Sequence, residues 1–310
     1  MCRQFQIKGI GSFEIPQRSN TVYIVGVDTY LGGHLAKSFL DSGIRVFGCG
    51  DSHILPGVLS NVKYTVTDYS GNWDFIAVDK YDWIIICHDP RKGRKCHLLV
   101  IESLVEYLRT KNMGTRLCYP SSSSICKEVH GKITEESPLC PRSELGLTIA
   151  SAEIFLQSIA YSRISPLYSY ILRFGDIYGD NIGLSNLPGL VNHYIEEAQQ
   201  KRVVSMYGLG LEQKTITNVQ DVCRLTLQYL NLDFQPKLIN LPGEKITIAE
   251  ITAIIAKKFG VEIQQIPLQI SDDIFDPYGG NQVLSVREIK SVMKYRLNIK
   301  FEPWVHRYAS

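Results

Sequence analysis

Apolar runs alternate with segments of helical period through the first half of the chain. Continuous apolar runs predict strands over residues 21–27, 44–48, 62–66, 82–87, 116–119 and 169–174. Between them, apolar side chains recur every three to four residues, which predicts helices over residues 31–42, 98–108 and 145–161. Strands that alternate with helices are typical of a parallel sheet covered by helices on both faces. The first half is therefore predicted to be α/β, with a Rossmann-like, doubly wound parallel sheet.

The pattern becomes less regular after Tyr178. Helices are still predicted over residues 190–200, 219–230 and 248–259, but stretches rich in Gly, Pro and Asn separate them. We interpret residues 20–178 as the sheet domain, to which residues 203–235 return. Residues 179–310 are interpreted as a smaller C-terminal lobe that binds the substrate.

Composition and charge exclude several classes of protein. The 310 residues are 45% hydrophobic and 21% charged, unlike a disordered or collagen-like chain. The net charge is +2, whereas a nucleic-acid binder usually carries a strong basic excess, so no nucleic-acid partner is expected. No run reaches the roughly 18 apolar residues that span a bilayer, and residues 1–16 lack the apolar core of a signal peptide. We expect a cytoplasmic protein without a membrane partner.

The eight cysteines are spread along the chain without a CxxC pair. No His stands at the spacing of a zinc ligand, so no metal site is expected. Cys49 and Cys87 fall within predicted strands, where a buried thiol behaves as a small apolar side chain. Reduced thiols of this kind favour a reducing compartment.

A glycine-framed turn follows the first predicted strand directly. It reads Gly26-Val27-Asp28-Thr29-Tyr30-Leu31-Gly32 and opens a predicted helix. Such a turn lets backbone N–H groups and the positive end of the helix approach a pyrophosphate, as in dinucleotide-binding proteins. Thr29 stands where a GxxGxxG motif has its middle glycine, so its Cβ would lie where the cofactor comes closest. The turn predicts either a dinucleotide site or a tight connection that packs a helix on a sheet.

Further segments of the chain resemble the motifs of one protein family, and they occur in the same order as in that family. They are the serine run 119–124, the segment Leu172-Arg173-Phe174-Gly175-Asp176-Ile177-Tyr178-Gly179, and the blocks at 207–210, 217–222 and 240–251. With the glycine turn, these segments make residues 20–300 similar to the extended short-chain dehydrogenase/reductases. The likeness is specifically to the NAD-dependent nucleotide-sugar epimerase/dehydratase family.

The resemblance implies a domain that binds NAD or, less favoured, NADP, and a lobe that closes over a nucleoside diphosphate sugar. A homodimer is compatible with it. It places the catalytic hydroxyl of the family on Ser122. It assigns the cofactor contacts to Gly26, Thr29, Tyr30, Leu31, Gly32 and, beside the adenine, Asp68.

Charged residues near the expected substrate and ribose positions allow more than one interpretation. Arg173 and Lys214 are the cations that the resemblance places near the substrate, although Lys214 could equally lie solvated on the surface. Asp176 replaces the substrate-binding Asn of the family, and a carboxylate there could repel a diphosphate. The acid that accepts the ribose hydroxyls of NAD normally ends the second strand. Asp51 lies one residue later than expected, with Gly50 in that position, so Asp51 is either this acid or a turn aspartate.

The reactive positions depart from the family pattern. The family uses a Tyr as general acid and base, and a Lys four residues later on the same helix face lowers the phenol pKa from about 10. Here Leu145 replaces the Tyr and Ile149 replaces the Lys, and neither side chain can transfer a proton. His88 and Asp89 replace two small residues after the fourth strand. His88 could supply a substitute acid–base group, lie in a loop, or alter the fit of the cofactor.

Two functions from different classes follow. In the first hypothesis, the chain is an epimerase/dehydratase-type protein that binds a dinucleotide and a nucleoside diphosphate sugar. Its acid–base groups would then be relocated if it is active. Alternatively, it is a catalytically inactive regulatory or scaffold subunit that keeps the cofactor. An RNA-binding relative of the same fold is disfavoured, because no basic stripe interleaved with aromatic residues is present.

Overall fold

The computed structural model describes residues 20–77, 81–111, 116–160, 167–184, 189–233, 235, 237–267 and 280–308. The N-terminal segment 1–16, which the sequence predicts to lack a signal peptide, lies outside these residues. Within them, no helix is long and apolar enough to cross a membrane, and no group of three His, Cys, Asp or Glu side chains could hold a metal ion.

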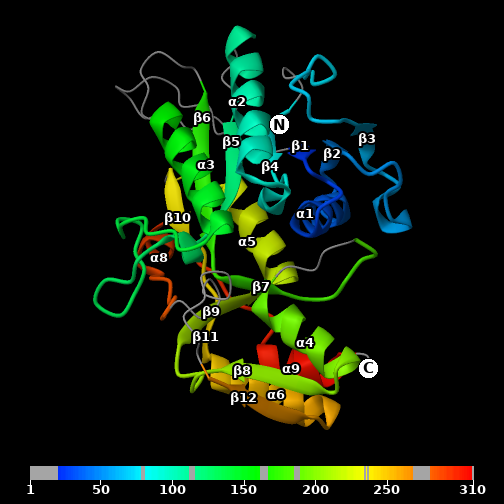
Figure 1. Ribbon diagram of the computed structural model, residues 1–310. Helices are drawn as coiled ribbons and strands as arrows, with labels where there is room; N and C mark the ends of the chain where they lie inside the picture. The colour runs from blue at the N-terminus through cyan, green and yellow to red at the C-terminus, as the bar shows by residue number, and fades with distance from the viewer. Residues whose placement is uncertain are drawn as a thin grey trace.

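A seven-stranded sheet forms the larger part of the molecule (Figure 1). Its order is β10-β6-β5-β4-β1-β2-β3, and all neighbouring strands are parallel. The strands are β1 (Thr21–Val25), β2 (Arg45–Gly50), β3 (Lys63–Val66), β4 (Trp83–Ile86), β5 (Arg116–Ser122), β6 (Tyr168–Phe174) and β10 (Leu238–Asn240). The chain order reverses between β1 and β4, which is the ligand-binding crevice of doubly wound sheets. The predicted Rossmann-like fold is confirmed, with β10 as an additional strand.

Helices cover both faces of this sheet (Figure 1). Apolar side chains of α1 (Tyr30–Asp41) and α5 (Val219–Leu230) pack on one face, and those of α2 (Arg94–Thr110) and α3 (Glu144–Ala160) pack on the other. Every residue of β1 and β4 is buried, because a strand covered on both faces has no polar side. Short 3-10 helices follow three strand ends: η1 (Gly57–Leu59), η3 (Pro90–Lys92) and η4 (Ser123–Ile125).

The smaller lobe is built from segments that follow β6, and it lies below the main sheet in Figure 1. Its strands are β7 (Asp176–Tyr178), β9 (Gln213–Asn218) and β11 (Glu244–Thr247) in one sheet, and the parallel pair β8 (Val203–Tyr207) and β12 (Glu262–Ile266). Its helices are α4 (Leu190–Gln200), α6 (Ile248–Phe259) and α9 (Phe301–Arg307). They enclose an apolar core of their own, while α8 (Arg287–Val292) packs beside β10.

The segment expected to return to the sheet domain, residues 203–235, divides between the two parts. Its helix α5 packs on the main sheet, whereas its strands β8 and β9 pair within the lobe. The main sheet also receives β10, which pairs with β6. The boundary between the two domains stays a prediction.

Local sequence sets the ends of α6. The Thr247 side chain accepts a hydrogen bond from the Glu250 N–H at 3.1 Å, and the Glu250 carboxylate accepts one from the Thr247 N–H at 2.8 Å. This capping box satisfies backbone donors that the first helical turn leaves free. Gly260, with φ +61°, ends the helix in the left-handed conformation that glycine adopts without strain. The helix predicted over residues 248–259 is confirmed.

Candidate functional site

A cavity of about 700 Å³ opens where β1, β4 and β5 end, between the main sheet and the smaller lobe. Ligands of doubly wound proteins bind at this edge of the sheet. The lining residues discussed below are Thr29, Tyr30, Leu31, His88, Tyr119, Ser122, Leu145, Ile149, Asp176, His193 and Lys214.

The glycine turn borders one end of the cavity and tolerates no side chain at its first and last positions. A Cβ on Gly26 would lie 2.7 Å from the carbonyl oxygen of Cys87, and Gly26 has φ +88°. A Cβ on Gly32 would lie 2.0 Å from the carbonyl oxygen of Gly26. The turn is therefore a close packing of backbone on backbone that places the start of α1 at the cavity wall.

Thr29 is the N-cap of α1. Its hydroxyl donates to the Gly26 carbonyl at 2.8 Å and accepts from the Gly32 N–H at 3.1 Å, so the side-chain oxygen is turned back onto the helix. Tyr30 and Leu31 follow in the first helical turn, whose N–H groups have no partner inside a helix. These residues fit a pyrophosphate, because the helix start and its positive end face the cavity.

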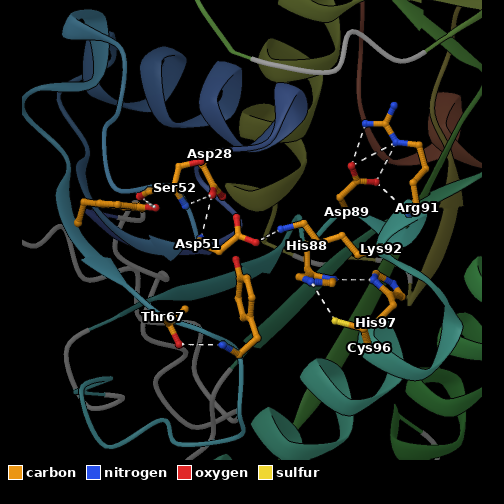
Figure 2. A network of polar contacts seen from close by, with 12 residues as sticks. Asp28, Asp51, Ser52, Thr67, His88, Asp89, Arg91, Lys92, Cys96 and His97 are labelled. Atoms are coloured by element: carbon orange, nitrogen blue, oxygen red, sulfur yellow. Dashed lines mark hydrogen bonds and ion pairs between the residues drawn. The ribbon is translucent and has the colours of Figure 1, made fainter.

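Beyond the turn, two predicted acids follow the ends of β2 and β3: Asp51, which Figure 2 shows beside Lys92, and Asp68. The Asp51 carboxylate forms an ion pair with Lys92 from η3. Burial alone would raise the pKa of Asp51, but the Lys92 ammonium outweighs it and keeps that pKa below its usual range. Asp68 is fully exposed after β3 and accepts a hydrogen bond from the Ser70 N–H at 2.9 Å. Its contact with an adenine stays a prediction.

Asp28, inside the glycine turn, also faces the end of β2. Its Oδ2 accepts hydrogen bonds from the N–H groups of Asp51 at 2.9 Å and Ser52 at 2.8 Å (Figure 2). Burial and the nearby Asp51 carboxylate raise the pKa of Asp28. Two carboxylates and one ammonium thus meet at this edge of the sheet.

His88 lines the cavity as the first member of a buried chain of polar side chains. Its Nδ1 lies 3.0 Å from Nδ1 of His97, whose Nε2 lies 3.1 Å from the hydroxyl of Tyr119. Burial, with the charge of Lys92, lowers the pKa of His88 to about 4, and burial lowers that of His97 to about 3. Both imidazoles are therefore uncharged at neutral pH, and His88 would be a weak base.

Ser122, at the end of β5, also lines the cavity. Its hydroxyl oxygen accepts a hydrogen bond from the Ser124 N–H at 3.1 Å, which holds the side chain in place. Leu145 and Ile149 line the same cavity from one face of α3. The predicted apolar pair therefore faces the cavity.

Arg173 does not reach this cavity, which corrects its assignment as a substrate cation. It is 2% exposed and pairs with Glu153 on α3, with Nη2 and Oε1 2.5 Å apart. The guanidinium also donates to the carbonyls of Thr134 and Glu135, and Ser121 donates to Glu153 at 2.6 Å. A charge this deeply buried needs such partners, so Arg173 joins α3 to β6.

Asp176 and Lys214 line the cavity from the smaller lobe. Asp176 accepts a hydrogen bond from the Leu190 N–H at 2.8 Å, at the start of α4. Burial raises its pKa to about 6, against the opposing effects of that N–H and of Lys214. Lys214 is 2% exposed and donates to the Gly280 carbonyl at 2.9 Å, so it is not a solvated surface residue.

Asp28, His97 and His193 were not among the predicted site residues. Asp28 stands within the glycine turn, where an acid beside a pyrophosphate is a visible anomaly. His97 continues the apolar stripe of α2 four residues before Ile101, which marks it as buried. His193 lies one turn after the start of α4 and lines the same cavity as Asp176.

Known proteins resemble this chain in sequence and in fold. The model of the NAD-dependent epimerase/dehydratase family matches residues 22–241. A putative UDP-glucose 4-epimerase of Methanocaldococcus jannaschii is 23% identical over 129 residues, 41% of each chain. The uncharacterized UDP-glucose epimerase YtcB of Bacillus subtilis is 25% identical over 184 residues, 57% of this chain and 54% of that protein. The matches thus span about half, or less, of these relatives.

Solved structures share the fold along nearly the whole chain. UDP-glucose 4-epimerase of Thermotoga maritima, with UDP-glucose, has a TM-score of 0.77 at 16% identity and covers 92% of this chain and 96% of its own. MoeE5, with UDP-glucuronic acid and NAD, has a TM-score of 0.74 at 20% identity with the same coverage. NAD is the cofactor of the family that the sequence match identifies. The chain belongs to the NAD-dependent epimerase/dehydratase family.

Proposed function

We propose that this chain binds NAD and a nucleoside diphosphate sugar in its cavity, and that it does not transfer protons by the usual Tyr–Lys route of the family. Leu145 and Ile149 carry the proposal, because they line the cavity at the positions where the resemblance places those two residues. Neither side chain can give or take a proton. Tyr30 and Tyr119 do not substitute, because burial raises the pKa of both phenols.

The two ends of the cavity support two phosphate-bearing ligands. At one end, the start of α1 behind Gly26 offers N–H groups and a positive helix end. At the other end, Lys214 brings a point charge that suits a diphosphate. Bound NAD would supply hydride transfer to or from a sugar carbon. Ser122 would hold a sugar hydroxyl between the two ends, as the resemblance implies.

Calorimetry with NAD and UDP-glucose, followed by turnover assays, tests the proposal. The parent protein should bind both ligands without converting the sugar. The double variant Leu145→Tyr with Ile149→Lys should gain turnover, because the Lys charge lowers the phenol pKa. Leu145→Tyr alone is the matched control and should stay inactive. Failure of the parent to bind NAD or UDP-glucose would refute the proposal, and turnover by the parent at ordinary rates, about 1 s⁻¹ or more, would require an acid–base group elsewhere in the cavity.

A second candidate function, catalysis by a relocated acid–base group, is favoured by one observation. Asp176 lines the cavity and its pKa is raised to about 6, near the pH at which such a group works best. In that case the parent would be active, and Asp176→Asn would abolish turnover while NAD still binds. An inactive parent favours the regulatory or scaffold role instead.

A further inference from the structure

The structure assigns the acid that recognises the adenosine ribose of the cofactor to Asp28, on the glycine turn, instead of to the end of β2. The inference rests on the proposed binding of NAD and deepens it, because it names the residue that selects NAD over NADP. The observations that carry it are the position of Gly50, the hydrogen bonds of Asp28 and the ion pair of Asp51.

Gly50 occupies the place where a ribose-binding acid would normally stand. In doubly wound sheets, an acid at the end of the second strand accepts the ribose hydroxyls. Here β2 ends at Gly50, and a Cβ on that residue would lie 2.2 Å from Oδ1 of Asp28. The Asp28 carboxylate therefore occupies the space that a side chain from position 50 would take. The acid is present, but it comes from the turn after the neighbouring strand β1.

Backbone hydrogen bonds hold the Asp28 carboxylate in this position. Its Oδ2 accepts from the N–H groups of Asp51 at 2.9 Å and Ser52 at 2.8 Å, the first two residues after β2 (Figure 2). The residue is partly exposed, so the carboxylate is not sealed from a ligand. A carboxylate fixed by two N–H donors needs little reorganisation to accept a ribose hydroxyl.

Asp51 is the less suitable acid, because it already has a charged partner. Lys92 reaches it from η3, on the β4 side of the turn (Figure 2). The Lys92 ammonium also lies 5.8 Å from the centre of the Tyr69 ring, which places it over this edge of the sheet. Asp51 is thus turned toward a cation, while Asp28 sits at the strand end.

The same arrangement opposes a 2′-phosphate. The N–H groups of Asp51 and Ser52 that could bind such a phosphate already donate to Asp28. A 2′-phosphate would in addition meet two carboxylates, Asp28 and Asp51, against the single ammonium of Lys92. Repulsion of this kind discriminates between ligands as effectively as a favourable contact. The site should therefore prefer NAD to NADP.

Calorimetric titration of NAD and NADP tests the assignment. Asp28→Asn should weaken NAD binding by about tenfold, because it removes the charge from a hydrogen bond to a ribose hydroxyl. It should also reduce the preference for NAD over NADP. Asp51→Asn should change NAD affinity by less than about threefold, since its main partner is Lys92. Asp41→Asn, an exposed carboxylate at the end of α1, is the control for loss of a charge.

A rescue variant keeps the test independent of folding. A Cβ at position 50 would also lie 2.5 Å from the Tyr64 hydroxyl, so the rescue is made in a Tyr64→Phe background. There, Asp28→Ala with Gly50→Asp returns the acid to β2, and it should recover NAD affinity relative to Asp28→Ala in the same background. Tighter NAD binding by Asp28→Asn would overturn the assignment, because the carboxylate would then be obstructing the site. A larger loss in Asp51→Asn than in Asp28→Asn would overturn it as well. If the parent binds UDP-glucose but not NAD, the proposed cofactor binding fails together with the assignment. If the parent binds NAD and Asp28→Asn is unchanged, the assignment alone fails.

Discussion

Replacing Glu153 with Gln is expected to destabilise the protein strongly, although the two side chains have nearly the same shape. Glu153 is fully buried and is the charged partner of Arg173. Its carboxylate also accepts hydrogen bonds from Ser121 at 2.6 Å and Gln157 at 2.9 Å. An amide in this place presents an NH₂ group to donors and leaves the buried guanidinium without a counter-charge.

The size of the effect follows from burial. Removing one partner of a buried ion pair costs about 3 to 5 kcal/mol, because an uncompensated charge remains in the interior. Arg173 would keep the carbonyls of Thr134 and Glu135, at 3.4 and 3.2 Å, but they carry only partial charges. With a urea m value of about 3 kcal/mol/M, the unfolding midpoint should fall by roughly 1 to 1.7 M.

Glu144→Gln is the matched control on the same helix. Glu144 pairs with Arg94 at 3.7 Å, but the two side chains are 71% and 44% exposed. Exposed pairs contribute about 0 to 1 kcal/mol, so its midpoint should move by less than about 0.3 M. Urea unfolding followed by tryptophan fluorescence and circular dichroism measures both variants. Equal midpoints for the two variants would refute the reasoning that burial makes the Glu153 pair different.

Two further outcomes are expected from the turn and from the thiols. Gly26→Val should abolish NAD binding in a calorimetric titration, because its φ of +88° and the Cys87 carbonyl at 2.7 Å leave no place for a side chain; unchanged affinity would contradict this. In the native protein, a thiol reagent should modify the exposed Cys140 rapidly and spare the fully buried Cys49 and Cys118; rapid modification of Cys49 and Cys118 as well would contradict their burial in the sheet.

The central strands β1 and β4 of the main sheet could be predicted because they are buried on both faces. Such strands are continuous apolar runs, as in Trp83–Ile86, and they need no tertiary information to be recognised. The short strand Leu238–Asn240 was missed, because three residues carry no periodic signal and it pairs with β6 from far along the sequence. Long-range pairing of this kind depends on topology, which local pattern does not contain.

The positions of site residues could be predicted where backbone geometry determines them. They could be predicted less well where a side chain can contact more than one partner. The turn could be predicted from Gly26 and Gly32, because the backbone there approaches too closely for a side chain. The shared face of Leu145 and Ile149 could be predicted from their helical spacing. Arg173 was misplaced because a strand end allows a side chain to face either the cavity or the interior. Its partner Glu153 determines the orientation, and that ion pair joins two residues that lie 20 positions apart on different elements.

Asp176→Asn is expected to tighten the binding of UDP-glucose at pH 8, with a gain that disappears as the pH falls. The pKa of Asp176 is raised to about 6, so the side chain is ionised at pH 8 and protonated at pH 5. Two unit charges about 10 Å apart interact by about 1.7 kcal/mol at an effective dielectric constant of about 20, which is more than tenfold in affinity. The parent should therefore bind the diphosphate more tightly as the pH falls through 6, while the variant stays nearly constant.

The stability of the same variant gives an independent measure of that charge. Because the folded-state pKa of Asp176 lies above the usual value of 3.8 for an aspartate, ionisation costs stability as the pH rises, and the full cost is present above about pH 6. Asp176→Asn should therefore stabilise the protein at pH 8 by about 1 to 3 kcal/mol and leave it unchanged at pH 3.5. Exposed Asp41→Asn, compared with the parent, controls for the general loss of a negative charge. A gain in affinity that is the same at pH 5 and pH 8 would mean that the carboxylate is not the source of the repulsion, and Asp176 would then act only as the cap of α4.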